Sequence, residues 1–117
     1  MKVKKYFLLI LVFWIPALFS CDTSVPYAPS DLTADAVTGA TFVLRWTDNS
    51  YNERSFQVQK SGSEDFIDCV ILGTSSNVRS RRDTNLDPDA TFYYRVAAVN
   101  KAGMSEWSNT ISARINN

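Results

Sequence analysis

The side chains best suited to chemistry in this chain are arginines and aromatic rings. Arg79 and Arg81 stand two residues apart in a stretch predicted to be extended, so they share one face. Guanidinium groups placed side by side can bind an anion or an acidic glycan. Tyr93 and Trp107 are predicted to lie on a sheet surface, where they could stack on a sugar ring or anchor a protein partner. The alternatives are a solvated strand edge that resists pairing and rings that cover neighbouring side-chain stems.

Composition argues against catalysis and against metal binding. The sequence has no histidine, which is the usual general base and the commonest metal ligand. The oxygen-rich loop 48–53 lacks the alternating acids and the glycine of a calcium loop. It is predicted to be a turn held by Asp and Asn side chains. Paired acids such as Glu64–Asp65 and Asp87–Asp89 fall in predicted turns, where solvated acids are the norm. We therefore expect a protein that is not an enzyme and needs no metal or cofactor.

The first twenty residues are typical of a secretory signal peptide. Three lysines up to Lys5 precede the run 6–19, which is apolar apart from Pro16. A membrane-spanning helix needs about 20 apolar residues, so this run is too short to span comfortably. The run ends in Leu18-Phe19-Ser20-Cys21, which resembles a bacterial lipobox: leucine three before the cysteine and a small residue just before it.

The lipobox resemblance implies that Cys21 becomes the acylated first residue of the mature chain. Two or more acyl chains would give a stable anchor to a membrane of the bacterial cell envelope, with the domain outside the cytoplasm. Asp22 resembles an inner-membrane retention signal of some Gram-negative bacteria, but the rule varies, so the choice of membrane stays open. The alternative is a secreted protein cut near the same place. A thioether on Cys21 would exclude a disulfide with Cys69, which is predicted to be a small buried side chain.

Charge gives no sign of a nucleic-acid partner. The whole chain carries 12 basic and 12 acidic side chains. Removing Lys2, Lys4 and Lys5 with the signal leaves nine basic against twelve acidic groups, a net charge of −3. A mildly acidic domain lacks the basic surface that nucleic acids require, so we expect no nucleic-acid binding.

Alternation of apolar and polar residues predicts seven strands and no helix after the signal. An edge strand is expected around Leu32 and Ala34, and the others at 41–47, 54–60, 66–72, 77–83, 92–99 and 105–115. This spacing predicts an all-β fold, a seven-stranded antiparallel immunoglobulin-like β-sandwich. The predicted core consists of Leu44, Trp46, Phe56, Val58, Leu86, Phe92, Tyr94 and Val96.

Four stretches of this pattern resemble a fibronectin type III domain. They are Ala28–Ala34, Leu44–Ser50 (LRWTDNS), Asp83–Pro88 (DTNLDP) and Tyr93–Asn100 (YYRVAAVN). The resemblance implies a linker at 21–28 and one domain over 29–117. Two positions depart from the family pattern. Phe92 stands where the family usually has the tyrosine of a corner hydrogen bond, and Arg81 stands where an inward aromatic is frequent, so it must reach solvent or a carboxylate.

The expected function is that of a non-enzymatic, membrane-anchored lipoprotein, a binding, adhesion or scaffold module at the cell envelope. Its partners would be the membrane, through the lipid on Cys21, and an unidentified protein or glycan. The alternative is an accessory carbohydrate-binding component of a polysaccharide-handling system, with Trp107 as the sugar platform. The fold alone does not choose between them, because this scaffold hosts many binding roles.

Overall fold

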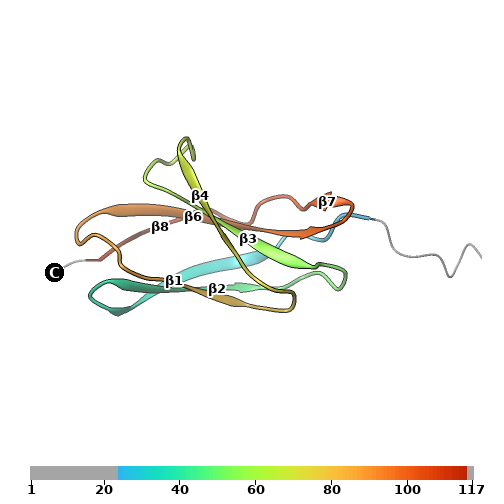
Figure 1. The fold of residues 1–117 in the computed structure, drawn as a ribbon, viewed down its shortest axis with the longest axis horizontal. Helices are drawn as coiled ribbons and strands as arrows, with labels where there is room; N and C mark the ends of the chain where they lie inside the picture. The colour runs from blue at the N-terminus through green and yellow to red at the C-terminus, as the bar shows by residue number, and fades with distance from the viewer. Residues whose placement is uncertain (1–23, 116–117) are drawn as a thin grey trace, which may run out of the picture.

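The computed structural model describes residues 24–115, so the predicted signal segment and Cys21 lie outside the described residues. Two antiparallel sheets face each other (Figure 1). The smaller has the order β1-β2-β5, and the larger runs β4-β3-β6, with β7 and β8 both pairing with β6. The strands are β1 (Ser30–Thr38), β2 (Thr41–Thr47), β3 (Ser55–Ser61), β4 (Cys69–Gly73), β5 (Ser80–Asp83), β6 (Thr91–Asn100), β7 (Gly103–Met104) and β8 (Ile111–Arg114). The predicted all-β sandwich is confirmed.

Of the last predicted strand, 105–115, only Ile111–Arg114 forms a regular strand in the structure. The backbone amides of Val96 and Ala98 donate to the hydroxyl oxygens of Ser108 (3.0 Å) and Ser105 (2.9 Å). The amides of Ser105 and Ser108 in turn donate to the carbonyls of Ala98 and Val96, each at 2.8 Å. Serine hydroxyls thus replace regular ladder bonds beside β6, and regular pairing resumes only at Ile111. Short polar side chains compete with backbone pairing in this way.

The strands β4 and β5 are shorter than the alternation predicted. Phe66 and Asn77, the first residues of the two predicted strands, have φ angles of 57° and 60°. The left-handed region is incompatible with extended strand backbone. Both residues therefore lie in turns, and the strands begin at Cys69 and Ser80.

The predicted core is confirmed with one exception. Seven of its eight residues are at most 5% exposed, and Phe92 is half-buried at the rim of the same cluster. Phe42 meets Tyr94 edge-on with ring centroids 6.2 Å apart, and Trp46 packs against Phe56 at 5.4 Å. Each fully buried side chain of this size contributes about 1.5–3 kcal/mol, so these contacts hold the two sheets together.

A charged cluster lies between the sheets, at residues that the sequence gave no reason to connect. Asp83 on β5 is 7% exposed, and its Oδ2 lies 2.8 Å from Lys60 Nζ on β3. Tyr94 on β6 donates its hydroxyl to the same oxygen at 2.7 Å. Lys60 Nζ also lies 4.4 Å from the centroid of the Phe92 ring. The cluster links the small sheet to the large one through one carboxylate.

Replacing Tyr94 with phenylalanine should change how stability depends on alkaline pH. Burial, and then the hydrogen bond to Asp83, raise the pKa of the Tyr94 hydroxyl far above its ordinary value of 10.0. The unfolded chain loses this proton above about pH 10 while the folded chain keeps it, so stability falls as pH rises further. One such group contributes a slope of at most about 1.4 kcal/mol per pH unit.

The measurement is urea unfolding at about pH 9 and pH 11. Tyr94→Phe should lose stability at the lower pH, through the missing hydrogen bond, and fall less steeply than wild type above pH 10. Tyr27→Phe, a change at an exposed ring, should leave the slope at its wild-type value. Equal slopes for wild type and Tyr94→Phe would contradict this assignment.

Candidate functional site

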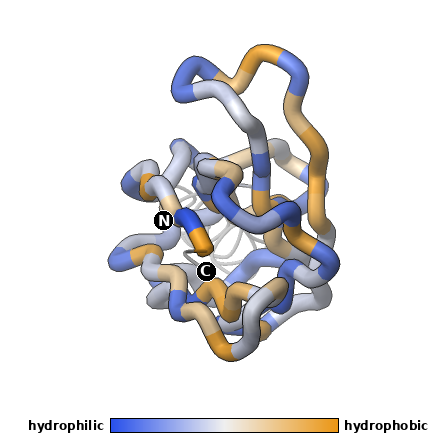
Figure 2. The backbone as a smooth tube through the Cα atoms, turned by 90° about the vertical axis from the view of Figure 1, so that its left-hand side faces the viewer, coloured by the Kyte–Doolittle hydropathy of each residue, from blue (hydrophilic) through white to orange (hydrophobic). Residues whose placement is uncertain are grey.

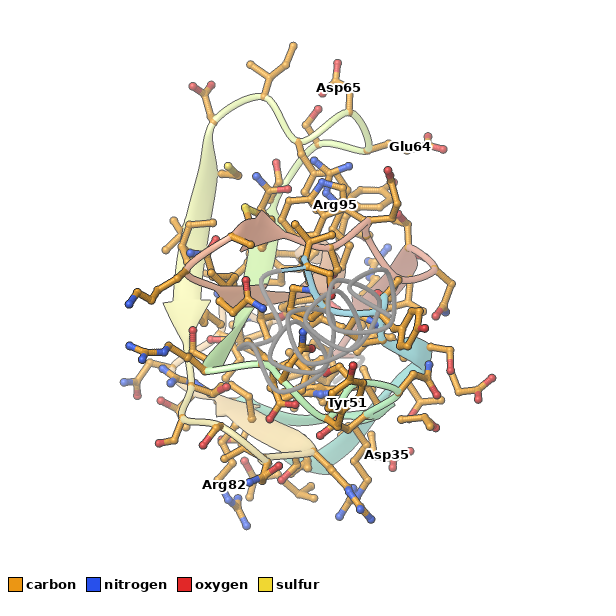
Figure 3. All side chains as sticks on the ribbon, turned by 90° about the vertical axis from the view of Figure 1, so that its right-hand side faces the viewer. Asp35, Tyr51, Glu64, Asp65, Arg82 and Arg95 are labelled. Atoms are coloured by element: carbon orange, nitrogen blue, oxygen red, sulfur yellow. The ribbon has the colours of Figure 1, made fainter. Side chains whose placement is uncertain are left out.

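A stacked arginine occupies the outer face of the larger sheet. The Arg95 guanidinium lies 4.2 Å from the ring centroid of Phe66 and 4.3 Å from that of Trp107. Its Nε donates to Gln59 Oε1 at 2.6 Å. Figure 3 shows Arg95 at the upper, larger-sheet side of the molecule. The guanidinium is thus held in one plane, and one face of the Trp107 ring is covered by a side chain of the protein itself.

The two predicted aromatic site residues share this region. Tyr93 and Arg95 are two apart on β6 and therefore lie on one face. Tyr93 and Trp107 are both half-buried. Sequence reasoning missed Arg95 and Phe66, because Phe66 reaches the outer face only through the turn that precedes β4.

The predicted arginine pair lies at the edge formed by β5. Arg81 is paired in register with the buried Leu44, so it starts from an inward position. Its Nη1 donates to the Gly73 carbonyl at 2.6 Å and its Nε to the Arg82 carbonyl at 3.2 Å. Arg81 is half-buried and makes both of these bonds at the exposed edge, so it reaches the surface as expected, with backbone carbonyls as its partners in place of a carboxylate. Arg79 precedes the strand and is exposed. A shallow groove beside them is lined by Gly73, Thr74, Ser75, Val78, Ser80, Arg81 and Arg82.

The oxygen-rich loop 48–53 is the turn that the sequence predicted. Asp48 Oδ1 accepts from the amide of Ser50 at 3.0 Å. The buried Glu53 accepts from the Ser50 hydroxyl and from the amide of Asn77, both at 2.9 Å. These carboxylates tie neighbouring loops together. Within residues 24–115, no group of three or more potential metal ligands is gathered in one place.

Asparagine side chains fasten the N-terminal segment 24–30 to one end of the sandwich. The Ser24 carbonyl accepts from Asn52 Nδ2 at 3.1 Å and from Asn100 Nδ2 at 2.9 Å. Asn49 Nδ2 donates to the Ala28 carbonyl at 2.9 Å. Pro26 and Pro29 of this segment are buried. The segment is therefore part of the folded domain, although part of it was predicted to be linker.

One edge of the larger sheet lacks the charges that guard the others. Within the described chain, the edge strands β1, β5 and β8 each carry Asp or Arg, whereas β4 reads Cys-Val-Ile-Leu-Gly. Val70 is 57% exposed, Ile71 46%, and the nearby Ile67 62%. Figure 2 shows the hairpin 61–73 standing away from the body, with hydrophobic colour along its β4 arm. Charged residues normally protect such edges against pairing with another chain.

The prediction of a buried Cys69 is wrong. The thiol is exposed on β4, and Gln59 Nε2 donates to its sulfur at 2.8 Å. The cause is the position of the strand, because an edge strand in a hairpin that stands away from the body is open on both faces. The sequence alone could not show this, since Cys69–Leu72 reads like any short buried strand.

Comparison with known proteins agrees with this architecture. The family model for the fibronectin type III domain matches residues 27–114. The chain belongs to the fibronectin type III family. Its fold is similar to that of the chicken CNTN1 FN1–FN3 domains (19% identity, TM-score 0.70), covering 79% of this chain and 33% of that one. It is also similar to the third fibronectin III domain of human KIAA0343 (15%, TM-score 0.68; 84% and 89% covered) and to a myokine structure (18%, TM-score 0.67; 79% and 99%).

These likenesses establish the fold of this fibronectin type III domain and nothing finer. No curated protein matches the sequence. Domains of this family are in general non-catalytic modules for binding or scaffolding. Among residues 24–115, no helix is long and apolar enough to cross a membrane.

Proposed function

We propose that this protein is a non-enzymatic lipoprotein of the bacterial cell envelope, anchored through acylated Cys21 and binding a protein partner along β4. The anchor rests on the signal pattern and on Leu18–Cys21. The absence of catalytic activity rests on the lack of histidine and on the use of the buried Glu53 and Asp83 in structural bonds.

The observation that carries the binding role is the uncharged, exposed edge of the larger sheet. Within the described residues β4 pairs only with β3. The backbone polar groups on its other side are therefore available to a further strand, apart from the Gly73 carbonyl, which accepts from Arg81. An extended segment of a partner can add to such an edge, with backbone hydrogen bonds giving affinity and side-chain contacts giving specificity. The side chains of Ile67, Val70 and Ile71 would supply apolar contact to that segment.

The carbohydrate-binding alternative relies on Trp107 as a platform for a sugar ring. The structure gives that ring an internal partner, Arg95. A sugar would have to use the other face or displace the guanidinium. We therefore favour the protein-binding edge.

Anchoring is tested by replacing each cysteine in turn in the producing bacterium. Wild type should sediment with membranes, take up an alkyne-labelled fatty acid and show an acylated N-terminal Cys21 in mass spectrometry. Cys21→Ser should lose the label and the membrane association, because the thioether cannot form. Cys69→Ser, the matched control, should keep both. An unmodified N-terminus located beyond Cys21 would refute the anchor.

The edge is tested by cross-linking in native cells followed by identification of co-purified proteins. Ile71→Lys places a charge on β4, whereas Val37→Lys places one on β1, at a side chain of nearly equal exposure (46% and 47%). Both variants should melt like wild type, since neither residue is in the core. A partner captured by wild type and Val37→Lys should be lost with Ile71→Lys. If Ile71→Lys captures the same proteins as wild type, β4 is not the binding edge.

A further inference from the structure

The end of the sandwich to which the N-terminal segment is fastened differs from the other end in its charges. Strand direction places the segment 24–29 and the loops 48–54, 74–79 and 101–102 at this end, which we call the tethered end (right in Figure 1). The exposed charged residues of these loops are Arg54, Arg79 and Lys101, all basic. The acids Asp48 and Glu53 are half-buried and buried, and both accept hydrogen bonds from Ser50. Asp31, the second residue of β1, is an exposed acid at the same end, and its Oδ2 accepts from the Ser30 and Thr47 hydroxyls, both at 3.4 Å.

The opposite end carries the reverse charge. Its loops are 39–40, 62–68 and 84–90. These loops contain no lysine or arginine, and they expose Glu64, Asp65, Asp68, Asp87 and Asp89. Arg114, the last residue of β8, lies 3.8 Å from Asp89 and offsets one of these five acids. A chain whose mature part is acidic overall therefore presents a basic end and an acidic end, and the basic one is where the chain arrives from Cys21.

Exposed apolar side chains also gather at the tethered end. Tyr27 is 67% exposed and Tyr51 76%, and Val25 and Met104 are exposed beside them. Figure 3 looks directly at this end and shows Tyr51 on it. Val25 lies close to β7: its Cγ1 would be 3.4 Å from a Cβ placed on Gly103. Tyrosine beside cationic side chains is the combination that favours the interface between membrane and water.

We infer that the tethered end lies directly against an anionic lipid surface, so that the domain has a fixed side toward its own membrane. This inference rests on the proposed acylation of Cys21. Three residue steps separate Cys21 from Ser24, and a fully extended chain spans at most about 11 Å over that distance. Since Ser24 is already bonded to Asn52 and Asn100, no flexible spacer remains to lift the domain away from the bilayer.

The occupant of this surface is lipid rather than a soluble protein, for two reasons. The short tether brings headgroups to the tethered end whether or not another protein is present. The charges also match, because anionic headgroups attract Arg54, Arg79 and Lys101 and repel the acidic end. A basic side chain near such a surface strengthens attachment on the order of fivefold. The 61–73 hairpin, with Glu64 and Asp65 near its tip, then stands out from the side of the domain, across the long axis (Figures 1 and 3).

The orientation is tested with the full lipidated protein in phosphatidylcholine–phosphatidylglycerol vesicles that contain nitroxide-labelled lipid. In a Cys69→Ser background, Ser76→Cys and Thr84→Cys place a fluorophore in an exposed loop at the tethered end or at the acidic end. Neither residue is part of the basic or apolar set. Lipid should quench the label at position 76 severalfold more than the label at position 84. Arg79→Glu with Lys101→Glu should remove that difference, whereas Arg82→Glu, an exposed control on β5, should keep it.

The outcomes separate this inference from the proposed function. If the chain is acylated and captured by vesicles but both labels are quenched equally, or the label at 84 more strongly, the orientation is refuted and the anchor stands. If the chain carries no acyl group and is not captured, the anchor fails and the orientation with it. Capture with preferential quenching at 76 that survives the double Glu variant would refute the role given to the basic residues.

Discussion

Replacing Lys60 with methionine is expected to lower the free energy of unfolding by about 3–5 kcal/mol, the cost of leaving one member of a buried ion pair without its partner. Methionine matches the lysine stem in length, so the loss arises chiefly from charge. Asp83 is 7% exposed, and Lys60 is its only cationic partner within the described residues. Removing that ammonium leaves a carboxylate between two apolar layers with the Tyr94 hydroxyl as its remaining donor.

The control variant removes the charge of Asp83 as well, so that no unpaired charge is left in the interior. In the double variant Lys60→Met with Asp83→Asn, the amide oxygen of residue 83 can still accept the Tyr94 hydroxyl, and no unpaired charge remains. Replacing a buried pair jointly is often close to neutral, so the double variant should regain most of the loss. Urea unfolding at neutral pH measures both. A typical single mutation changes the free energy of unfolding by about 1 kcal/mol. If Lys60→Met alone costs no more than about that amount, the Lys60–Asp83 pair is effectively solvated.

Replacing Arg95 with alanine should cost about 2–3 kcal/mol, because it removes two ring contacts and a charged hydrogen bond together. The guanidinium is packed between Phe66 and Trp107 and bonded to Gln59. Without it, Phe66 loses the group that covers its ring on the outer face. The fluorescence of Trp107 should shift to longer wavelength as the ring meets water.

Two further variants distinguish stacking from charge. Arg95→Lys keeps the charge but has no planar group to lie between two rings, so it should recover only part of the loss. Arg45→Ala removes an exposed arginine that lies 3.5 Å from Asp35, and such surface pairs contribute little, so it should change stability by under about 1 kcal/mol. Thermal or urea unfolding measures the stability of all three variants, Arg95→Ala, Arg95→Lys and Arg45→Ala. Full recovery by lysine would mean that the rings contribute nothing specific to arginine.

Short-range patterns were sufficient for the parts of the fold that repeat every two residues. Strand β2 covers Thr41–Thr47 as predicted. The inward positions at the centre of β3 and β6 are buried: Phe56, Val58, Tyr94, Val96 and Ala98. Alternation worked there because both neighbours of a central strand are present, so facing inward means burial. The same rule failed for Cys69 at an edge. The departure at Phe92 is visible in the sequence, but its half-buried place beside Lys60 is not.

Interactions between distant residues could not be read from the chain. Lys60, Asp83 and Tyr94 come from three strands in two sheets, and each by itself is an ordinary residue for its position. Arg95 and Trp107 are twelve residues apart, and Phe66 reaches them only because its turn bends over the sheet. The sequence indicates that an arginine at position 81 is unusual for an inward position. It does not indicate the acceptor, because the Gly73 carbonyl belongs to β4, the edge strand of the other sheet.

The sequence by itself determined the all-β class, the buried residues of the central strands and the fibronectin type III pattern, because these depend on residues close together in the chain. It also supplied the lipobox resemblance. Only the tertiary structure decided which strand is an unguarded edge and which loops share an end. A net charge of −3 over residues 21–117 hides a basic tethered end and an acidic far end, because antiparallel strands bring every second loop to the same side.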